Sequence, residues 1–157
     1  MNRRDAMVSG LGAGLALVIA TNADAQPKKA PAPKPPEPKK PDARAALLAS
    51  LATCLAKATL CDAHCAAQLA TGNKEFARCA SAVRDMLAVG QATESLVSRT
   101  SAMAKKLVEL CAAACKECSA ACLEHKAHWA HGMHIECKEC MEACDACLKA
   151  CTAFAAA

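Results

Sequence analysis

The C-terminal residues 137–151, CKECMEACDACLKAC, hold five cysteines at successive intervals of three, four, three and four residues. Residues 111–122, CAAACKECSAAC, hold four more at intervals of four, three and four. At about 100° per residue, each set falls within an arc of roughly 60–80° on a helix. A bundle helix normally carries its apolar side chains on such a face, so thiols take the place of Leu and Ile.

Thiols at this spacing suit a soft metal ion. Side chains three or four residues apart on a helix have Cβ atoms roughly 5–6 Å apart, close enough for two sulfurs to bind one ion through bonds of about 2.3 Å. Thiolates select Cu(I), Zn(II) or iron–sulfur clusters. Zinc favours closed tetrahedral sets near loops, and iron–sulfur sites typically use cysteine-rich loops, often with a proline. No proline follows Pro41, and a continuous helical stripe fits Cu(I) best.

The charge balance also favours a univalent ion. If each thiolate bridges two ions, the 13 cysteines neutralise about as many Cu(I) ions, whereas divalent ions at that ratio would leave a large buried positive charge. We therefore predict that multiple Cu(I) ions bind, with a zinc or iron–sulfur protein as the alternative. The predicted thiolate ligands are Cys54, Cys61, Cys65, Cys79, Cys111, Cys115, Cys118, Cys122, Cys137, Cys140, Cys144, Cys147 and Cys151.

Histidine and methionine gather beside these cysteines. Residues 125–134, HKAHWAHGMH, hold four histidines and a methionine. This segment is either a polar connection that happens to be rich in histidine, or a vestibule that accepts Cu(I) weakly and passes it to the nearest thiols. For the second possibility, the additional metal ligands are His64, His125, His134, Met133 and Met141.

The elements that position these residues are four helices. From Asp42 onward the chain is rich in alanine and has no proline, which favours helix nearly everywhere. Caps and glycines delimit helices over about residues 43–70, 74–97, 102–126 and 134–154. Short connections between them predict an all-α fold, an antiparallel four-helix bundle with a cysteine-lined core.

Antiparallel packing predicts how the thiols are layered. Counted from the end that carries the turns 71–73 and 127–133, the expected levels are Cys65, Cys79, Cys122 and Cys137; then Cys61, Cys118 and Cys140; then Cys115 and Cys144; then Cys54, Cys111, Cys147 and Cys151. The column they form should be about 20–25 Å tall at 1.5 Å per residue. Above it the expected core side chains are Leu47, Leu48, Leu51, Met86, Leu96, Met103 and Leu107.

The first 42 residues are expected to lie outside the bundle. Residues 1–25 combine Arg3–Arg4, a weakly apolar stretch too short to span a bilayer, and a small-residue cleavage pattern at Ala23–Ala25. These features favour a twin-arginine (Tat) signal over a general secretory one, and hence export to a bacterial periplasm. Residues 26–42 hold all seven prolines and predict an extended linker. The bundle itself spans 43–157.

Composition excludes several other functions. Most of the net charge of +4 comes from the first 42 residues, so the bundle is near neutral and nucleic acid is not an expected partner. No Ser/His/Asp set, phosphate-binding loop or His-x-x-Glu motif is present, so we predict no enzyme.

No stable membrane span is expected. A different class of function, a helical scaffold stapled by disulfides, is disfavoured because the cysteine number is odd and helical neighbours do not meet at disulfide geometry.

The chain resembles the four-helix-bundle copper storage proteins. The resemblance covers about residues 45–155 and is carried by CAAACKECSAACLEH (111–125), HIECKECMEACDACLKAC (134–151), CDAHC (61–65) and Cys79. It implies storage of many Cu(I) ions, export through a Tat signal, a homotetramer, and supply of copper to a copper-accepting enzyme or chaperone. In exported relatives, methionines near the first hairpin accompany a histidine placed like His64. Here residues 68–76 hold no methionine, and the His/Met group lies at the second hairpin.

Overall fold

The computed structural model describes residues 42–157, so the predicted signal and nearly all of the predicted linker lie outside the described residues. Every regular element in this part is helical, and the elements are α1 (Ala43–Ala70), η1 (Lys74–Phe76), α2 (Ala77–Ser98), α3 (Ala104–Leu123), η2 (Lys126–His131) and α4 (Ile135–Ala155). The predicted all-α class is confirmed.

Local capping explains where the helices begin and end. The Asp42 carboxylate accepts a hydrogen bond from the backbone N–H of Arg44 at the start of α1, and the Asn73 side chain accepts one from Glu75 N–H at the start of η1. Gly72, with a φ of 89°, ends the first helical segment in a left-handed conformation that costs glycine little. These caps are the ones that the sequence indicated.

Two predicted boundaries are wrong by a few residues. The second segment begins as the 3₁₀ turn η1 before α2 starts at Ala77, and the third helix ends at Leu123 and is followed by η2 instead of continuing to 126. In the tighter turn, His125 N–H bonds to Cys122 O at 3.1 Å, and the His125 side chain is buried. This burial comes from tertiary contact, which helix propensity does not encode.

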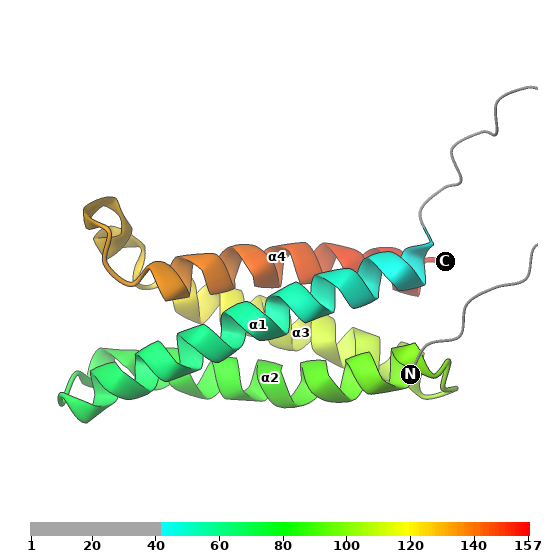
Figure 1. Cartoon of the computed structure of the whole chain (residues 1–157), viewed down its shortest axis with the longest axis horizontal. Coiled ribbons are helices and arrows are strands. Elements are labelled where there is room, and N and C mark those ends of the chain that lie inside the picture. The colour runs from blue at the N-terminus through cyan, green and yellow to red at the C-terminus, as the bar shows by residue number, and fades with distance from the viewer. Residues whose placement is uncertain (1–41) are drawn as a thin grey trace, which may run out of the picture. The chain divides into compact units, whose positions relative to one another are not determined.

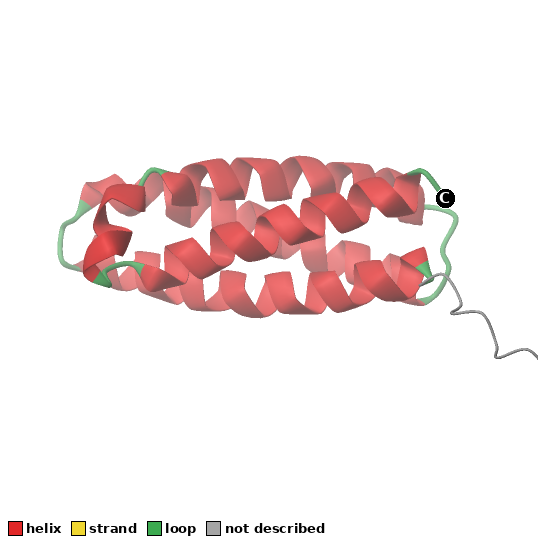
Figure 2. Cartoon of the chain, turned by 90° about the horizontal axis from the view of Figure 1, so that it is seen from above, coloured by secondary structure: helices red, strands yellow, loops and turns green. Residues whose placement is uncertain are grey.

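The four long helices run up and down along a common axis, with the connections at the two ends (Figures 1 and 2). Helix α1 packs against α2 and α4, and α3 packs against the same two, so α1 and α3 face each other diagonally. In Figure 1, α1 crosses its neighbours obliquely. This is the predicted antiparallel four-helix bundle.

The core divides into two zones along this axis. Thiols fill the part nearer the η1 and η2 turns, and apolar side chains fill the other part, where Leu47, Leu51, Val97 and Val108 are buried. Of the predicted apolar residues, Leu48 and Leu96 are half-buried and pack against the core, and Leu107 is half-buried. Met103 was predicted wrongly: it precedes α3 and is 56% exposed.

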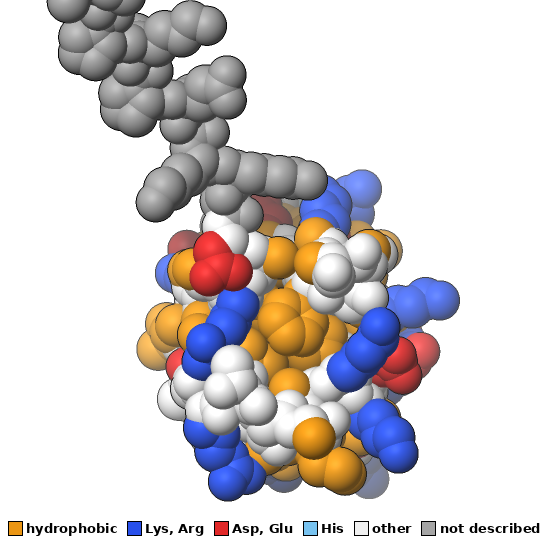
Figure 3. Space-filling model, turned by 90° about the vertical axis from the view of Figure 1, so that its right-hand side faces the viewer, with side chains coloured by type: hydrophobic (Ala, Val, Ile, Leu, Met, Phe, Trp, Pro, Cys, Tyr) orange, Lys and Arg blue, Asp and Glu red, His pale blue; other side chains and the backbone are white. Residues whose placement is uncertain are grey.

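The two ends of the bundle differ in surface chemistry. At the end where α1 begins and α4 finishes, apolar side chains lie at the centre with lysine and arginine around them (Figure 3). Arg44 links two helices there, because its Nε donates to Val97 O at 2.9 Å and its Nη2 donates to Ser98 O. The histidines lie at the opposite end, beside the thiols.

Helix α1 is also the one described helix that is long and apolar enough to cross a membrane by length and composition. Its buried residues include Leu47, Leu51, Cys54, Cys61 and Cys65, which form part of the bundle core. The core helix of a bundle passes the same test of length and hydropathy, so this finding adds no evidence for a membrane span.

Candidate metal-binding column

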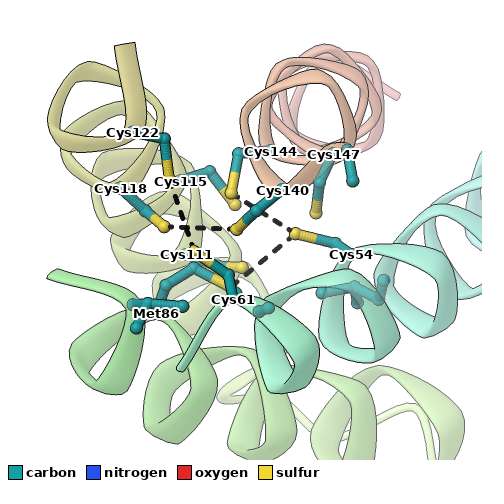
Figure 4. Close-up of a cluster of buried hydrophobic side chains, with 14 of the residues drawn as sticks. Cys54, Cys61, Met86, Cys111, Cys115, Cys118, Cys122, Cys140, Cys144 and Cys147 are labelled. Carbon is teal, nitrogen blue, oxygen red and sulfur yellow. Dashed lines mark hydrogen bonds between the residues drawn. The ribbon is translucent and has the colours of Figure 1, made fainter. Parts of the chain in front are cut away.

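All thirteen cysteines are free thiols and all are buried. Figure 4 shows nine of them, from α1, α3 and α4, with their side chains pointing toward one another in the bundle interior. No disulfide is present between them, and the nearest sulfur pairs lie 3.6–4.0 Å apart. The arrangement therefore differs from a scaffold stapled by disulfides.

The lowest part of the column centres on Cys61. Its Sγ lies 4.0 Å from the Sγ of Cys65, 3.8 Å from those of Cys79 and Cys137, and 3.9 Å from that of Cys122. The Sγ atoms of Cys61, Cys65, Cys79 and Cys137 all lie within 4.8 Å of one another. Two sulfurs bound to one trigonal ion through bonds of about 2.3 Å are about 4 Å apart, so these thiols could share ions with little movement.

Higher groups of three thiols continue the column. They are Cys61, Cys122 and Cys140; Cys118, Cys140 and Cys144; Cys54, Cys115 and Cys144; and Cys111, Cys147 and Cys151. Cys61, Cys140 and Cys144 each belong to two groups, so the lowest group and the first three of these higher groups are linked, as bridging thiolates would require. The group of Cys111, Cys147 and Cys151 shares no member with the others.

The levels expected from the sequence are partly wrong. Cys61 shares a group with Cys140, as expected, but also joins the lowest group, and Cys54 lies beside Cys115 and Cys144 instead of with the highest group. Counting residues from the turns assumes that all helices run parallel to the axis. Because α1 runs obliquely (Figure 1), its cysteines meet those of α3 and α4 at other heights.

Two effects shift the pKa values of these thiols in the absence of metal, namely burial and the hydrogen bonds that the thiols make with one another. The pKa of Cys79 is lowered to about 4, chiefly by its hydrogen bond with Cys122. The pKa of Cys122 is raised well above its usual value, first by its hydrogen bond with Cys118 and also by burial. A sulfur that accepts S–H bonds is stabilised as thiolate, while the donor keeps its proton.

Histidines from two hairpins meet at the lower end of the column. His64 on α1 lies with its Nε2 3.0 Å from Nδ1 of His134, and its Nδ1 lies 3.4 Å from Oε2 of Glu136. A carboxylate at this position can help to orient the His64 ring, as carboxylates beside metal-binding histidines do. Burial, followed by the charge of His64, lowers the pKa of His134, which favours the neutral ring that can bind a metal ion.

Phe76 and His125 complete this histidine cluster, which we define as His64, His125, His134 and Phe76. The rings of Phe76 and His125 are stacked, with centroids 4.1 Å apart and an interplanar angle of 3°. His125 is 5% exposed, and its Nε2 is one of two buried side-chain nitrogens without a hydrogen-bond partner in residues 42–157, the other being Trp129 Nε1. A buried ring nitrogen with no partner is costly, and in its unprotonated form it suits a transient metal ligand.

The other residues predicted beside the histidines are less closely gathered. Met133 is 45% exposed, and Met141 is half-buried against the core from α4. His128 lies 5.4 Å from His134 between ring centroids, and His131 is exposed. Sequence reasoning missed Phe76 and Glu136. Phe76 is one of two phenylalanines in the chain and lies next to the first turn. That position could have indicated that its ring packs at this end of the bundle.

Comparison with known proteins agrees with this geometry. A sequence model of a family described as copper storage protein matches residues 40–156. The chain belongs to the copper storage protein family. The match leaves out residues 1–39, which contain the predicted signal and most of the linker.

Solved structures of copper storage proteins share the fold. One is a cytosolic copper storage protein from Streptomyces lividans with five coppers, at 26% identity and a TM-score of 0.63, covering 73% of this chain and 93% of that one. Another is the S. lividans copper storage protein loaded with 10 copper equivalents, at the same identity and TM-score. The alignment covers 73% of this chain and 84% of that one. No curated protein sequence matched the chain.

Proposed function

We propose that this protein stores Cu(I), holding many ions on the thiolates of its column for sequestration and later supply. The observation that carries the proposal is the set of thirteen buried, unbonded thiols, every one of which belongs to a close group of three or four. Soft thiolates favour Cu(I), and one positive charge per thiolate keeps the buried column near neutral. Storage of this kind needs no catalytic step. Family membership and the copper-loaded structures of relatives support the same function.

Anaerobic titration with Cu(I) in the presence of a chromophoric chelator tests the proposal. We expect the protein to withhold copper from the chelator until close to one ion per cysteine has bound. In parallel titrations with Zn(II), the protein should saturate with far fewer ions, because each divalent ion neutralises two thiolates and the buried column reaches charge balance sooner. Saturation after only one or two Cu(I) ions, or a larger capacity for zinc, would contradict copper storage.

The histidine cluster is the proposed route for copper into the column. It lies where the lowest thiols end, and it brings together imidazoles from both hairpins, with Glu136 orienting His64. Neutral imidazoles bind Cu(I) more weakly than a set of thiolates, so an ion would move inward toward Cys65 and Cys137. Met133 and Met141 are proposed as auxiliary ligands on this route.

Replacing the cluster histidines should slow loading without reducing capacity. The test variant combines His64→Ala, His125→Ala and His134→Asn, because Asn tolerates the left-handed conformation of His134, whose φ is 56°. Stopped-flow transfer from a Cu(I)–chelator complex measures the rate, and we expect a decrease of at least about tenfold, typical of lost metal-site residues. His131→Ala, on an exposed residue of the same turn, is the matched control. Equal rates in all proteins would exclude this route.

Copper affinity should fall as the pH is lowered. Cys122 and Cys144 have raised pKa values, chiefly through hydrogen bonds with Cys118 and Cys115 respectively, so they are protonated at neutral pH and must release protons on binding. Cys79, with its pKa near 4, releases none. Each released proton weakens binding by about tenfold per pH unit below the thiol pKa. Chelator competition at several pH values measures the slope, and a flat profile would argue against thiolate ligation.

Export and assembly are further parts of the proposal. Arg3–Arg4 and the apolar stretch after them support a Tat signal in residues 1–25, and this route exports folded proteins, which would protect buried thiols from periplasmic oxidation. Fusing residues 1–42 to a reporter tests this, because Arg3→Lys with Arg4→Lys should abolish export. We also propose a tetramer that supplies a copper-accepting enzyme or chaperone, by resemblance to the family.

A further inference from the structure

Helix α2 contributes few sulfurs to the column. Its one cysteine is Cys79, near the lower end, whereas α1, α3 and α4 each carry several. Met86 lies seven residues after Cys79, two turns further on the same face of the helix, and it is fully buried. Figure 4 shows Met86 on α2 below the thiol groups of the other helices.

The thioether of Met86 contacts a thiol directly. Cys54 Sγ lies 3.7 Å from Met86 Sδ and donates its S–H to it, and the same Sγ lies 3.7 Å from Cys144 Sγ. Cys54, Cys115 and Cys144 form one of the thiol groups of the column. At this height α1, α2, α3 and α4 therefore contribute one sulfur each, namely Cys54, Met86, Cys115 and Cys144.

Local packing keeps the Met86 sulfur at this place. A Cβ atom at Gly90, one turn further along α2, would lie 2.9 Å from Leu55 Cδ2 and 3.6 Å from Met86 Sδ. The missing side chain leaves room for the Leu55 and Met86 side chains against the helix. In this packing the Met86 side chain extends along α2 beside Gly90 and places its sulfur next to Cys54.

We propose that Met86 is an internal Cu(I) ligand, binding an ion that is also held by Cys54 and by Cys115 or Cys144. This inference rests on the proposed storage function. A thioether is a soft ligand that favours Cu(I), and two sulfurs on one trigonal ion need a separation of about 4 Å, near the 3.7 Å observed between Met86 Sδ and Cys54 Sγ. Because a thioether is neutral, Met86 completes the coordination without releasing a proton and without adding charge.

X-ray absorption at the selenium edge tests the bond itself. The full-length protein, with Met133→Leu and Met141→Leu to remove the other candidate thioethers, is produced with selenomethionine and loaded with Cu(I). We expect a copper neighbour at bonding distance from selenium, and its loss when Met86→Leu is added. A selenium spectrum without copper, or one that Met86→Leu leaves unchanged, would overturn the assignment.

Chelator competition gives a second readout. In otherwise unchanged protein, Met86→Leu should weaken binding of the ions held at this level by at least about tenfold, as loss of metal-site residues does, while all thirteen thiols remain. Met103→Leu, at an exposed methionine, is the matched control and should bind like the wild type. Thermal unfolding of the copper-free variants verifies that both fold.

The two proposals fail in different ways. If the chain binds close to one Cu(I) per cysteine but the selenium spectrum shows no copper neighbour, the proposal that Met86 is a ligand is wrong and the storage function is unaffected. If the wild-type chain itself saturates after one or two ions, the storage function is wrong, whatever the selenium spectrum shows.

Discussion

Saturation with Cu(I) is expected to raise the melting temperature of this protein by at least about 20 °C. A ligand that binds only the folded state at 100 times its Kd stabilises that state by about 2.7 kcal/mol per site, and each kcal/mol raises the melting temperature by about 2–8 °C in domains of this size range. Several filled sites therefore exceed 20 °C, even after allowing for copper binding to unfolded thiols. Calorimetry or circular dichroism under anaerobic conditions measures the shift.

The rise should be reversible and should depend on the thiols. Removing copper with excess chelator is expected to return the transition to that of the copper-free protein. A variant with Cys65→Ser, Cys79→Ser and Cys137→Ser removes much of the lowest group and should show a smaller rise on loading. An identical transition with and without copper would contradict the column as the binding site, because buried ligation must couple to folding.

Leu51→Ala is expected to destabilise the copper-free protein by about 2–5 kcal/mol, the usual cost of truncating a fully buried Leu. Leu51 is 0% exposed and lies in the apolar zone, one turn before Cys54. Cysteine and alanine bury little area per residue, so the apolar zone supplies much of the hydrophobic stabilisation before copper binds. Urea unfolding under reducing conditions measures the loss.

Leu110→Ala is the matched control, because Leu110 on α3 is 52% exposed. Its effect should stay within about 0.5 kcal/mol, as for surface substitutions generally. Below its unfolding transition, Leu51→Ala should still bind close to one Cu(I) per cysteine, since it removes no sulfur. A loss of capacity in the folded variant would show that the apolar zone and the column are not separate.

Cysteine spacing and helix signals were sufficient to predict the fold and the inward position of the thiols. Intervals of three and four residues keep Cys111 and Cys137 on the same face as the cysteines that follow them, and Asp42, Gly72 and Asn73 mark helix ends through local hydrogen bonds and backbone conformation. These properties depend only on residues that are close together in the sequence, so they can be predicted from the sequence alone.

The heights of the thiols and their partners were decided by tertiary structure. The oblique path of α1 places Cys54 beside Cys144 and gives Cys61 its central position, because crossing angles depend on how whole helix faces pack. Met103 lies outside the core for a similar reason, since the chain turns just before α3 begins.

The histidine cluster required both sources of information. The sequence indicated histidines near the second hairpin and His64 on the first helix, but only the folded chain brings His64 to His134 and stacks Phe76 on His125. Spacing along a helix fixes which side chains share a face. Which side chains from different helices touch depends on the relative position of those helices, and the packing of the complete core sets that position.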